Sequence, residues 1–154
     1  MKRRESVLLL VSLLTGCAGR GDTGNTATEQ PSTPDPGDQL SVSIHPGTDE
    51  DSTSHEKQER VVVTNESETD ATIRRYYLEY SSNHRYSFDR VSLAPGEKIV
   101  VVSQGSGDAT LESNPPVHVR DANFPELVTA DGEETVMLKN PDGKTVVDAT
   151  YSGG

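Results

Sequence analysis

After residue 17 the sequence has no window of eleven or more residues with the 3.6-residue period of an amphipathic helix. It contains instead about eight short runs of β-branched or alternating apolar residues, separated by turn-forming residues. These runs are Leu40–Ile44, Arg60–Thr64, Ile73–Tyr80, Tyr86–Phe88, Lys98–Ser103, Val117–Val119, Thr135–Lys139 and Thr145–Tyr151. Their number and spacing predict an all-β sandwich or barrel.

Residues 40–154 contain all of these runs and are expected to form the one folded domain. A chain of this length buries roughly two-thirds of its unfolded surface, which is enough for a single core. The inward-facing positions of the runs predict that core: Val42, Ile44, Val61, Val63, Ile73, Leu78, Phe88, Leu93, Ile99, Val101, Val136, Leu138, Val147 and Tyr151.

The first sixteen residues have the pattern of a signal peptide. Three cations, Lys2, Arg3 and Arg4, precede the apolar run Val7–Leu14. This run spans about 12 Å as a helix, far less than the roughly 30 Å of a bilayer core. It is therefore too short to cross a membrane and is typical of a signal-peptide core. The adjacent Arg3-Arg4 leaves open whether export follows the general or the twin-arginine route.

The segment Leu14-Thr15-Gly16-Cys17 that ends this run resembles the lipobox of prokaryotic lipoproteins. The resemblance implies cleavage after residue 16 and a lipid on the sulfur of Cys17. Cys17 is the only cysteine, so it cannot form an intramolecular disulfide. We therefore expect a protein held on the cell membrane by lipid and facing outside the cytoplasm.

Residues 17–39 are expected to be a flexible linker between the anchor and the domain. After Cys17 this stretch contains Gly, Ser, Thr, Asp, Asn, Gln and Pro but no large apolar residue. Such a composition cannot bury enough apolar surface to offset the entropy lost on ordering. The linker would carry the domain away from the membrane surface.

The chain is acidic, with a formal net charge of -11 from 14 basic and 25 acidic residues. Cleavage after residue 16 removes three basic residues and one acidic residue, leaving 11 and 24, or -13. This charge repels nucleic acid, so a nucleic-acid partner is not expected. Acid excess with few lysines is also typical of halophiles, where salt screens the self-repulsion.

The order of motifs between Glu59 and Tyr151 resembles the lamin tail domain. Glu59–Asn65 is similar to its first diagnostic strand, and Leu93-Ala-Pro-Gly96 with Ile99–Val102 to its Pro-Gly turn and following strand. Ser103–Gly107 resembles its glycine-containing loop. The final hairpin of the family corresponds to Glu134–Leu138, Asp142-Gly143 and Val146–Tyr151. The resemblance implies an immunoglobulin-like sandwich of about seven to nine strands and a non-catalytic accessory module.

One family feature differs here. The family carries a Gly-Trp pair in the strand that corresponds to Ile73–Leu78, and this chain has no tryptophan. Either Arg75-Tyr76 or Tyr76-Tyr77 takes the place of that pair. The aromatic residue at the centre of the core is therefore left open.

The sequence favours neither catalysis nor a cofactor. No Gly-x-Ser-x-Gly elbow is present, and Gly105-Ser-Gly107 is predicted to be a tight turn rather than a phosphate loop. The four histidines, His45, His55, His84 and His118, are too scattered to predict a metal site. Calcium at the acidic loop Asp49-Glu50-Asp51 with Glu56 is an alternative to a solvated loop.

Two further features are candidate sites. Arg74, Arg75, Arg85 and Arg90 alternate with aromatic residues, a pattern that fits either ligand contact or a core bordered by paired arginines. Asn65-Glu66-Ser67 is an N-glycosylation sequon in a turn expected to be exposed, and Asn65 also fits a structural role at the end of a strand.

These observations favour a non-enzymatic surface interaction or adhesion module with a protein or polysaccharide partner. The alternative is an accessory domain that binds DNA, polysaccharide or calcium for a partner enzyme or transporter. A small hydrolase is the third and weakest hypothesis.

Overall fold

A computed structural model describes residues 39–48 and 53–153 of the chain. Its regular structure is eleven β-strands. They are β1 (Leu40–His45), β2 (Arg60–Asn65), β3 (Ala71–Arg74), β4 (Tyr77–Tyr80), β5 (Arg85–Ser87), β6 (Arg90–Leu93), β7 (Lys98–Val102), β8 (Ala109–Leu111), β9 (Val117–Asp121), β10 (Glu133–Lys139) and β11 (Thr145–Ser152). No helix among the described residues has the length and apolar character needed to cross a membrane.

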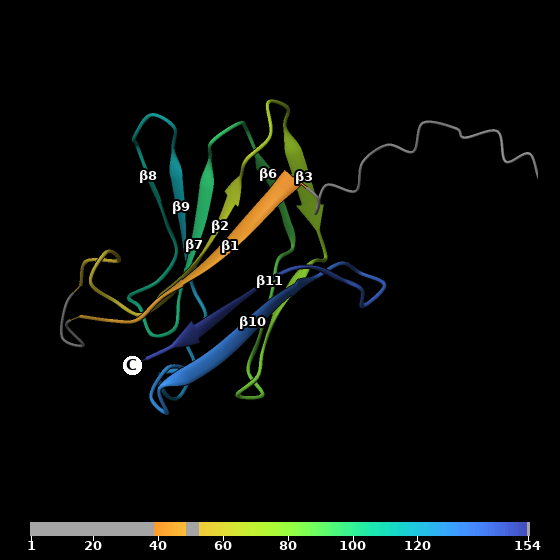
Figure 1. The fold of residues 1–154 in the computed structure, drawn as a ribbon. Helices are drawn as coiled ribbons and strands as arrows, with labels where there is room; N and C mark the ends of the chain where they lie inside the picture. Colours follow the sequence, from red (N-terminus) through yellow and green to blue (C-terminus); the bar gives the residue numbers. More distant parts are fainter. Residues whose placement is uncertain (1–38, 49–52, 154) are drawn as a thin grey trace, which may run out of the picture. The chain divides into compact units, whose positions relative to one another are not determined.

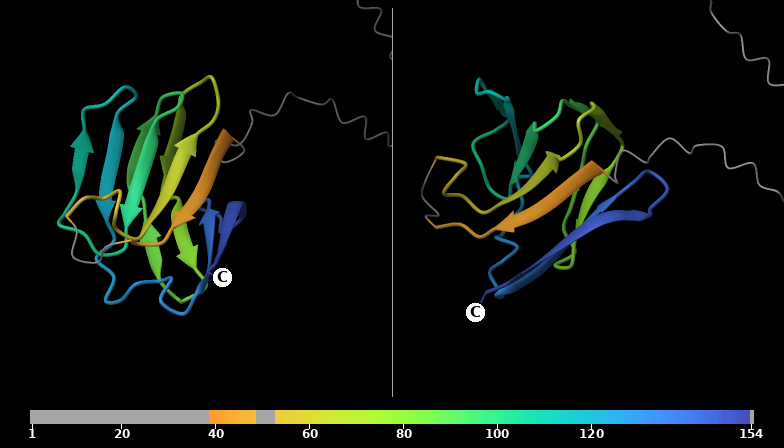
Figure 2. Two further views of the ribbon diagram at one scale, coloured as in Figure 1. Left: turned by 60° about the vertical axis from the view of Figure 1, so that its left-hand side comes forward. Right: turned by 45° about the horizontal axis from the view of Figure 1, so that its top comes forward.

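The strands form two layers and a connecting ribbon (Figure 1, Figure 2). A five-stranded sheet has the order β1-β2-β7-β9-β8, and a four-stranded sheet has the order β11-β10-β4-β5. Strands β3 and β6 pair only with each other. Pairing is antiparallel except between β7 and β9. The expected all-β sandwich is therefore confirmed, with more strands than the predicted seven to nine.

One long hairpin, bent twice, links the two layers. Its base is the β2–β7 pair in the five-stranded sheet, its middle is the β3–β6 pair, and its tip is the β4–β5 pair in the four-stranded sheet. Asn65 ends β2 at the first bend, and Arg75 separates β3 from β4 at the second. These two residues therefore mark the places where the hairpin leaves one layer and enters the next.

Arg75 explains why the predicted strand Ile73–Tyr80 is two strands. Its φ is 61°, in the left-handed region, and its backbone N–H donates to the carbonyls of Phe88 and Asp89. Glycine occupies such a conformation without strain, and Tyr76 beside it is buried. Arg75-Tyr76, rather than Tyr76-Tyr77, thus corresponds to the Gly-Trp pair of the resembling family.

The core lies between the two layers, and most of its predicted members are buried there. Ten of the fourteen predicted residues are buried: Val61, Val63, Ile73, Leu78, Phe88, Leu93, Ile99, Val101, Val136 and Leu138. Val42, Ile44 and Val147 are half-buried and pack against this core. Buried aromatics complete it, because Tyr80 meets Phe124 edge to face with ring centroids 5.2 Å apart.

The prediction that Tyr151 belongs to the core is wrong. Tyr151 is half-exposed and is not part of the buried cluster. It faces the same side of β11 as Val147, but it pairs with Glu134, beyond the apolar end of the core. The alternation of residues along β11 therefore predicts correctly which face of the strand the Tyr151 side chain is on, but not that the side chain is half-exposed.

Candidate functional site

Four arginines and one tyrosine line the outward face of the bent hairpin; we call this surface the arginine ribbon. Arg74 and Arg90 are directly opposite each other in the β3–β6 pair, and both are exposed. Ile73 and Val91 beside them face the core. Because side chains alternate along strands, the two guanidinium groups lie on the outer face. Arg75 follows at the bend and is also exposed.

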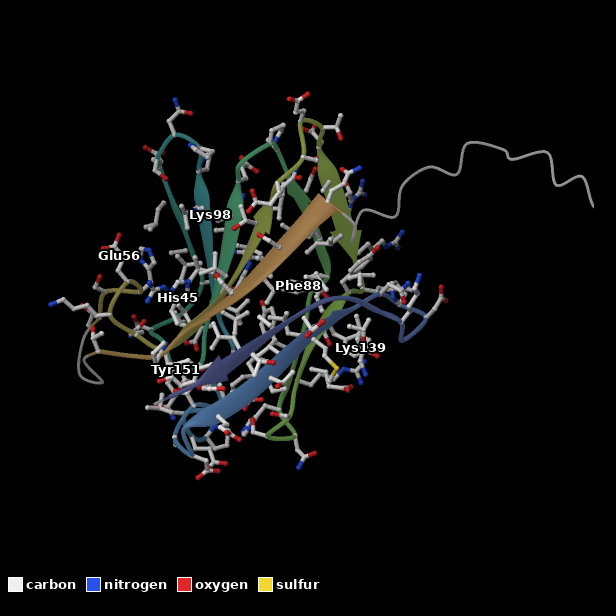
Figure 3. All side chains as sticks on the ribbon, in the orientation of Figure 1. His45, Glu56, Phe88, Lys98, Lys139 and Tyr151 are labelled. Atoms are coloured by element: carbon white, nitrogen blue, oxygen red, sulfur yellow. The ribbon has the colours of Figure 1, made fainter. Side chains whose placement is uncertain are left out.

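The ribbon continues onto the four-stranded sheet through Tyr77 and Arg85. The guanidinium carbon of Arg85 lies 3.6 Å from the centroid of the Tyr77 ring, a cation–π contact. Next to them, Lys139 Nζ lies 2.6 Å from Glu79 Oε1 (Lys139 is labelled in Figure 3). None of the four ribbon arginines has a carboxylate within 4.0 Å among the described residues. The ribbon arginines are therefore not paired to carboxylates in this part of the chain, whereas the expected core role of the neighbouring aromatics is confirmed for Tyr76, Tyr80 and Phe88, which are buried.

A small polar cavity of about 170 Å³ adjoins the ribbon at Arg90. Asp89, Tyr86 and the weak Arg120–Asp108 ion pair (3.9 Å) line it. Burial, followed by the charge of Asp108, raises the pKa of the Tyr86 phenol, and the charge of Arg120 offsets part of this. The phenol is therefore neutral at physiological pH and can only donate or accept hydrogen bonds there.

Asn65 is not in the exposed turn that the sequence predicted. Its side chain is 0% exposed, and its Nδ2 donates to the carbonyls of Thr69 and Leu93, each at 2.8 Å. Its Oδ1 accepts from the N–H and the hydroxyl of Ser67. A sugar on Nδ2 would have to displace these bonds in the folded domain. The geometry supports the structural role for Asn65 and argues against glycosylation of the folded protein.

The Gly105–Gly107 turn holds a carboxylate of the protein itself. The amides of Gly105 and Gly107 donate to the two oxygens of Asp121, each at 3.0 Å. A phosphate would need these same amides. A Cβ on Gly105 would lie 2.5 Å from Val102, so the close approach of the loop requires glycine. The turn is thus a structural element, as the sequence indicated.

Two buried glutamates, which the sequence analysis did not select, fix loops to the sandwich. Glu59 accepts from the Ser103 and Thr129 hydroxyls and from the amides of Val128 and Thr129. Glu134 accepts from the hydroxyl of Ser81 at 2.6 Å. Both side chains are at most 3% exposed, and neither forms an ion pair among the described residues. Both glutamates stand in stretches that the sequence analysis compared with the lamin tail domain, Glu59–Asn65 and Glu134–Leu138, but those stretches alone do not indicate that the two side chains are buried.

Tyr80 lies near these two carboxylates. Burial first, and then the charges of Glu59 and Glu134, raise the pKa of its phenol above the ordinary value. The Tyr80 hydroxyl and Glu134 Oε2 are buried without a hydrogen-bond partner in the described structure. Because the phenol stays protonated, this group is a neutral part of the core rather than a nucleophile or base.

The histidines do not assemble a catalytic or metal centre in the described residues. His45 and His84 each contact a nearby serine hydroxyl at 3.0 Å, Ser43 and Ser82 respectively. His118 instead faces Glu97 at 3.7 Å. No three His, Cys, Asp or Glu side chains converge in residues 39–48 and 53–153. Cys17 and the acidic residues Asp49–Asp51 lie outside the described residues.

The bent hairpin, the two packed layers and the anchored loops define the class of this chain: an immunoglobulin-like β-sandwich. A sequence model of the lamin tail domain matches residues 36–153. The chain belongs to the lamin tail domain family. A search of curated proteins finds no match to the chain. Domains of this family are typically non-catalytic.

Proposed function

We propose that this protein is a lipid-anchored, non-enzymatic interaction module that binds an acidic partner through its arginine ribbon. Cys17 would carry the lipid, and residues 17–39 would hold the domain outside the cell membrane. The lamin tail family supports the module, and the lipobox resemblance supports the anchor. The acidic composition further suggests a halophilic source.

The observation that carries the proposal is a set of four exposed arginines along the bent hairpin of an acidic domain, none of them with a carboxylate within 4.0 Å in the part of the chain that the structure describes. Residues 40–154 contain only ten Lys and Arg against 20 Asp and Glu. Cations placed together usually repel one another, and here Arg74 and Arg90 are direct cross-strand neighbours. An acidic partner would relieve this repulsion and accept the planar guanidinium donors.

A polysaccharide or a protein of the cell surface fits this surface better than nucleic acid. The net charge of the chain opposes the dense, uniform charge of nucleic acid more strongly than a sparsely charged polysaccharide or a local acidic patch on a protein. In a polysaccharide, a sugar ring can stack beside Tyr77 while Arg85 and its neighbours bind the carboxylates. In a protein, an acidic surface patch can supply the carboxylates that the arginines bind. The accessory ligand-binding role with a polysaccharide therefore remains the second candidate.

The anchor is tested by Cys17→Ser in the full chain. We expect the variant either to remain uncleaved or to be released into the medium, because the sulfur that carries the lipid is absent. Fractionation of the producing cells, with mass spectrometry of the N-terminal peptide, measures both outcomes. A variant that is still cleaved and still membrane-bound would refute the lipoprotein assignment.

The ribbon is tested by adding soluble protein, starting at residue 17 and carrying Cys17→Ser, to washed envelopes of the producing cells. We expect Arg74→Glu with Arg90→Glu to reduce the bound fraction by at least about tenfold, since two charges are reversed at the contact. Treating the envelopes with protease or with periodate distinguishes a protein partner from a polysaccharide.

Two further variants serve as controls for this experiment. Arg75→Gly removes a ribbon charge and also relieves roughly 1 kcal/mol of left-handed strain, so it should weaken binding without lowering the melting temperature. Lys57→Glu reverses an exposed charge outside the ribbon and should bind as the parent does. Equal binding by the parent and the double variant would exclude the ribbon as the contact surface.

A further inference from the structure

A second surface lies on the outward face of the five-stranded sheet, away from the arginine ribbon. Alternate residues of β1, β2, β7 and β9 and the loop before β2 line a groove of about 300 Å³ there; we call it the cationic groove. Its lining includes Ser43, His45, Arg60, Thr64, Lys98 and the three valines Val62, Val100 and Val117. The intervening residues of β1, β2 and β7 face the core. Figure 3 labels His45 and Lys98 of the groove.

Three basic side chains line this groove, His45 and Arg60 on one side of the Val62–Val100 pair and Lys98 on the other. His45 is the direct neighbour of Arg60 in the β1–β2 pair, and Lys98 is the neighbour of Thr64 in the β2–β7 pair. Arg60 uses one nitrogen to hold the loop, donating to the carbonyls of Glu56 and Gln58. Within the described residues, no carboxylate lies within 4.0 Å of Arg60 or Lys98. Glu56 also lines the groove, but the ammonium of Lys98 and the remaining nitrogens of Arg60 stay available to an anion.

The floor of the groove is apolar. Val62 and Val100 are cross-strand neighbours that form a small cluster with Val102, and Val117 packs against it. This arrangement is typical of small-molecule sites, in which an apolar surface receives the body of the ligand and a few polar groups orient it. A volume of about 300 Å³ is at the lower end for such sites and is too small for a folded partner.

We propose that the cationic groove binds a small monocarboxylate with a short, branched apolar body. Arg60 and Lys98 contact the carboxylate, the hydroxyls of Ser43 and Thr64 border it, and the valine floor receives the body. A carboxylate matches the two-nitrogen fork of arginine. A single charge suits a chain whose net charge of -11 repels polyanions.

Protonation of His45 is expected to couple to this binding. Burial, then Arg60, then Lys98 lower the pKa of His45, so the ring is neutral at pH 7 in the free protein. Its other charged or titratable neighbours in the groove are His55 and Glu56 of the loop. A bound anion favours the charged imidazolium, so binding raises the pKa of His45. The affinity for the anion is therefore expected to increase as the pH falls below 7 and His45 becomes protonated.

The test is an NMR titration of the soluble Cys17→Ser chain with isovalerate, acetate and inorganic phosphate. We expect isovalerate to shift the valine methyl signals of the groove, to raise the titration midpoint of His45, and to bind at least about tenfold more tightly than acetate. Phosphate tests whether charge alone suffices. Phosphate or acetate binding as tightly as isovalerate would overturn the proposal, as would the absence of any shift at millimolar isovalerate.

Matched variants separate the groove from general charge effects. Lys98→Gln removes an exposed cation of the groove and should weaken isovalerate binding about tenfold. Lys57→Gln removes an exposed cation that does not line the groove and should leave the affinity unchanged. Equal losses in the two variants, or no loss in Lys98→Gln, would refute the assigned contact. The ribbon binding described above is independent of either result.

Discussion

Replacing Glu59 with alanine is expected to lower the free energy of unfolding by about 3 kcal/mol, enough to unfold a marginally stable domain at moderate temperature. The carboxylate is 3% exposed and accepts four hydrogen bonds, two of them from backbone amides. Each buried donor left without an acceptor costs about 1–3 kcal/mol. Relief of the desolvated charge offsets part of this loss.

Urea unfolding followed by circular dichroism measures the effect of Glu59→Ala. Glu59→Gln keeps the shape but places an NH₂ group against the donors of Thr129, so it should lose about half as much stability. Glu133→Ala removes an exposed glutamate and should change stability by less than about 0.5 kcal/mol. If Glu59→Ala unfolds at the same urea concentration as Glu133→Ala, the four bonds do not stabilise the loops.

Replacing Asn65 with aspartate is expected to lower the free energy of unfolding by about 2–4 kcal/mol, although the two side chains have nearly the same shape. Nδ2 is the only donor of the Asn65 side chain to the carbonyls of Thr69 and Leu93. An aspartate oxygen at that position would repel both carbonyls. Because these bonds hold the first bend of the hairpin, amide exchange should accelerate around residues 65–70 and 93–97.

Ser67→Ala is the matched control for Asn65. It also destroys the Asn65-Glu66-Ser67 sequon but leaves both Nδ2 bonds in place. We expect it to be clearly more stable than Asn65→Asp. If Asn65 instead carries a glycan in the folded protein, both variants would lose the same mass when isolated from the producing cells, and the parent would retain it.

The strands and most of the core could be predicted from the sequence because local alternation of apolar residues determines them. Val61, Val63, Ile99 and Val101 alternate with outward-facing residues, and all four are buried. The bends could not be predicted in this way. The left-handed conformation of Arg75 depends on its bonds to Phe88 and Asp89, thirteen or more residues away in the chain.

The candidate sites also differ in how far the sequence alone reveals them. The ribbon arginines are close in sequence, so their clustering is visible there. The groove residues His45, Arg60 and Lys98 come from three strands, and only the pairing of β1, β2 and β7 brings them together. Burial of Glu59 is equally hidden, since its donors follow it by 44 to 70 residues.

The strand order also determines which backbone edges remain open. The five-stranded sheet ends at β1 and β8, and the four-stranded sheet ends at β11 and β5. The two long edges, β1 and β11, lie against each other, as Figure 1 shows. The free edges β8 and β5 have three residues each, and the two strands of the β3–β6 pair, each open on its outer side, have four. Pro115 and Pro116 follow β8. Such short edges give a neighbouring copy little backbone to pair with, so the domain can be crowded on a surface without forming intermolecular sheets.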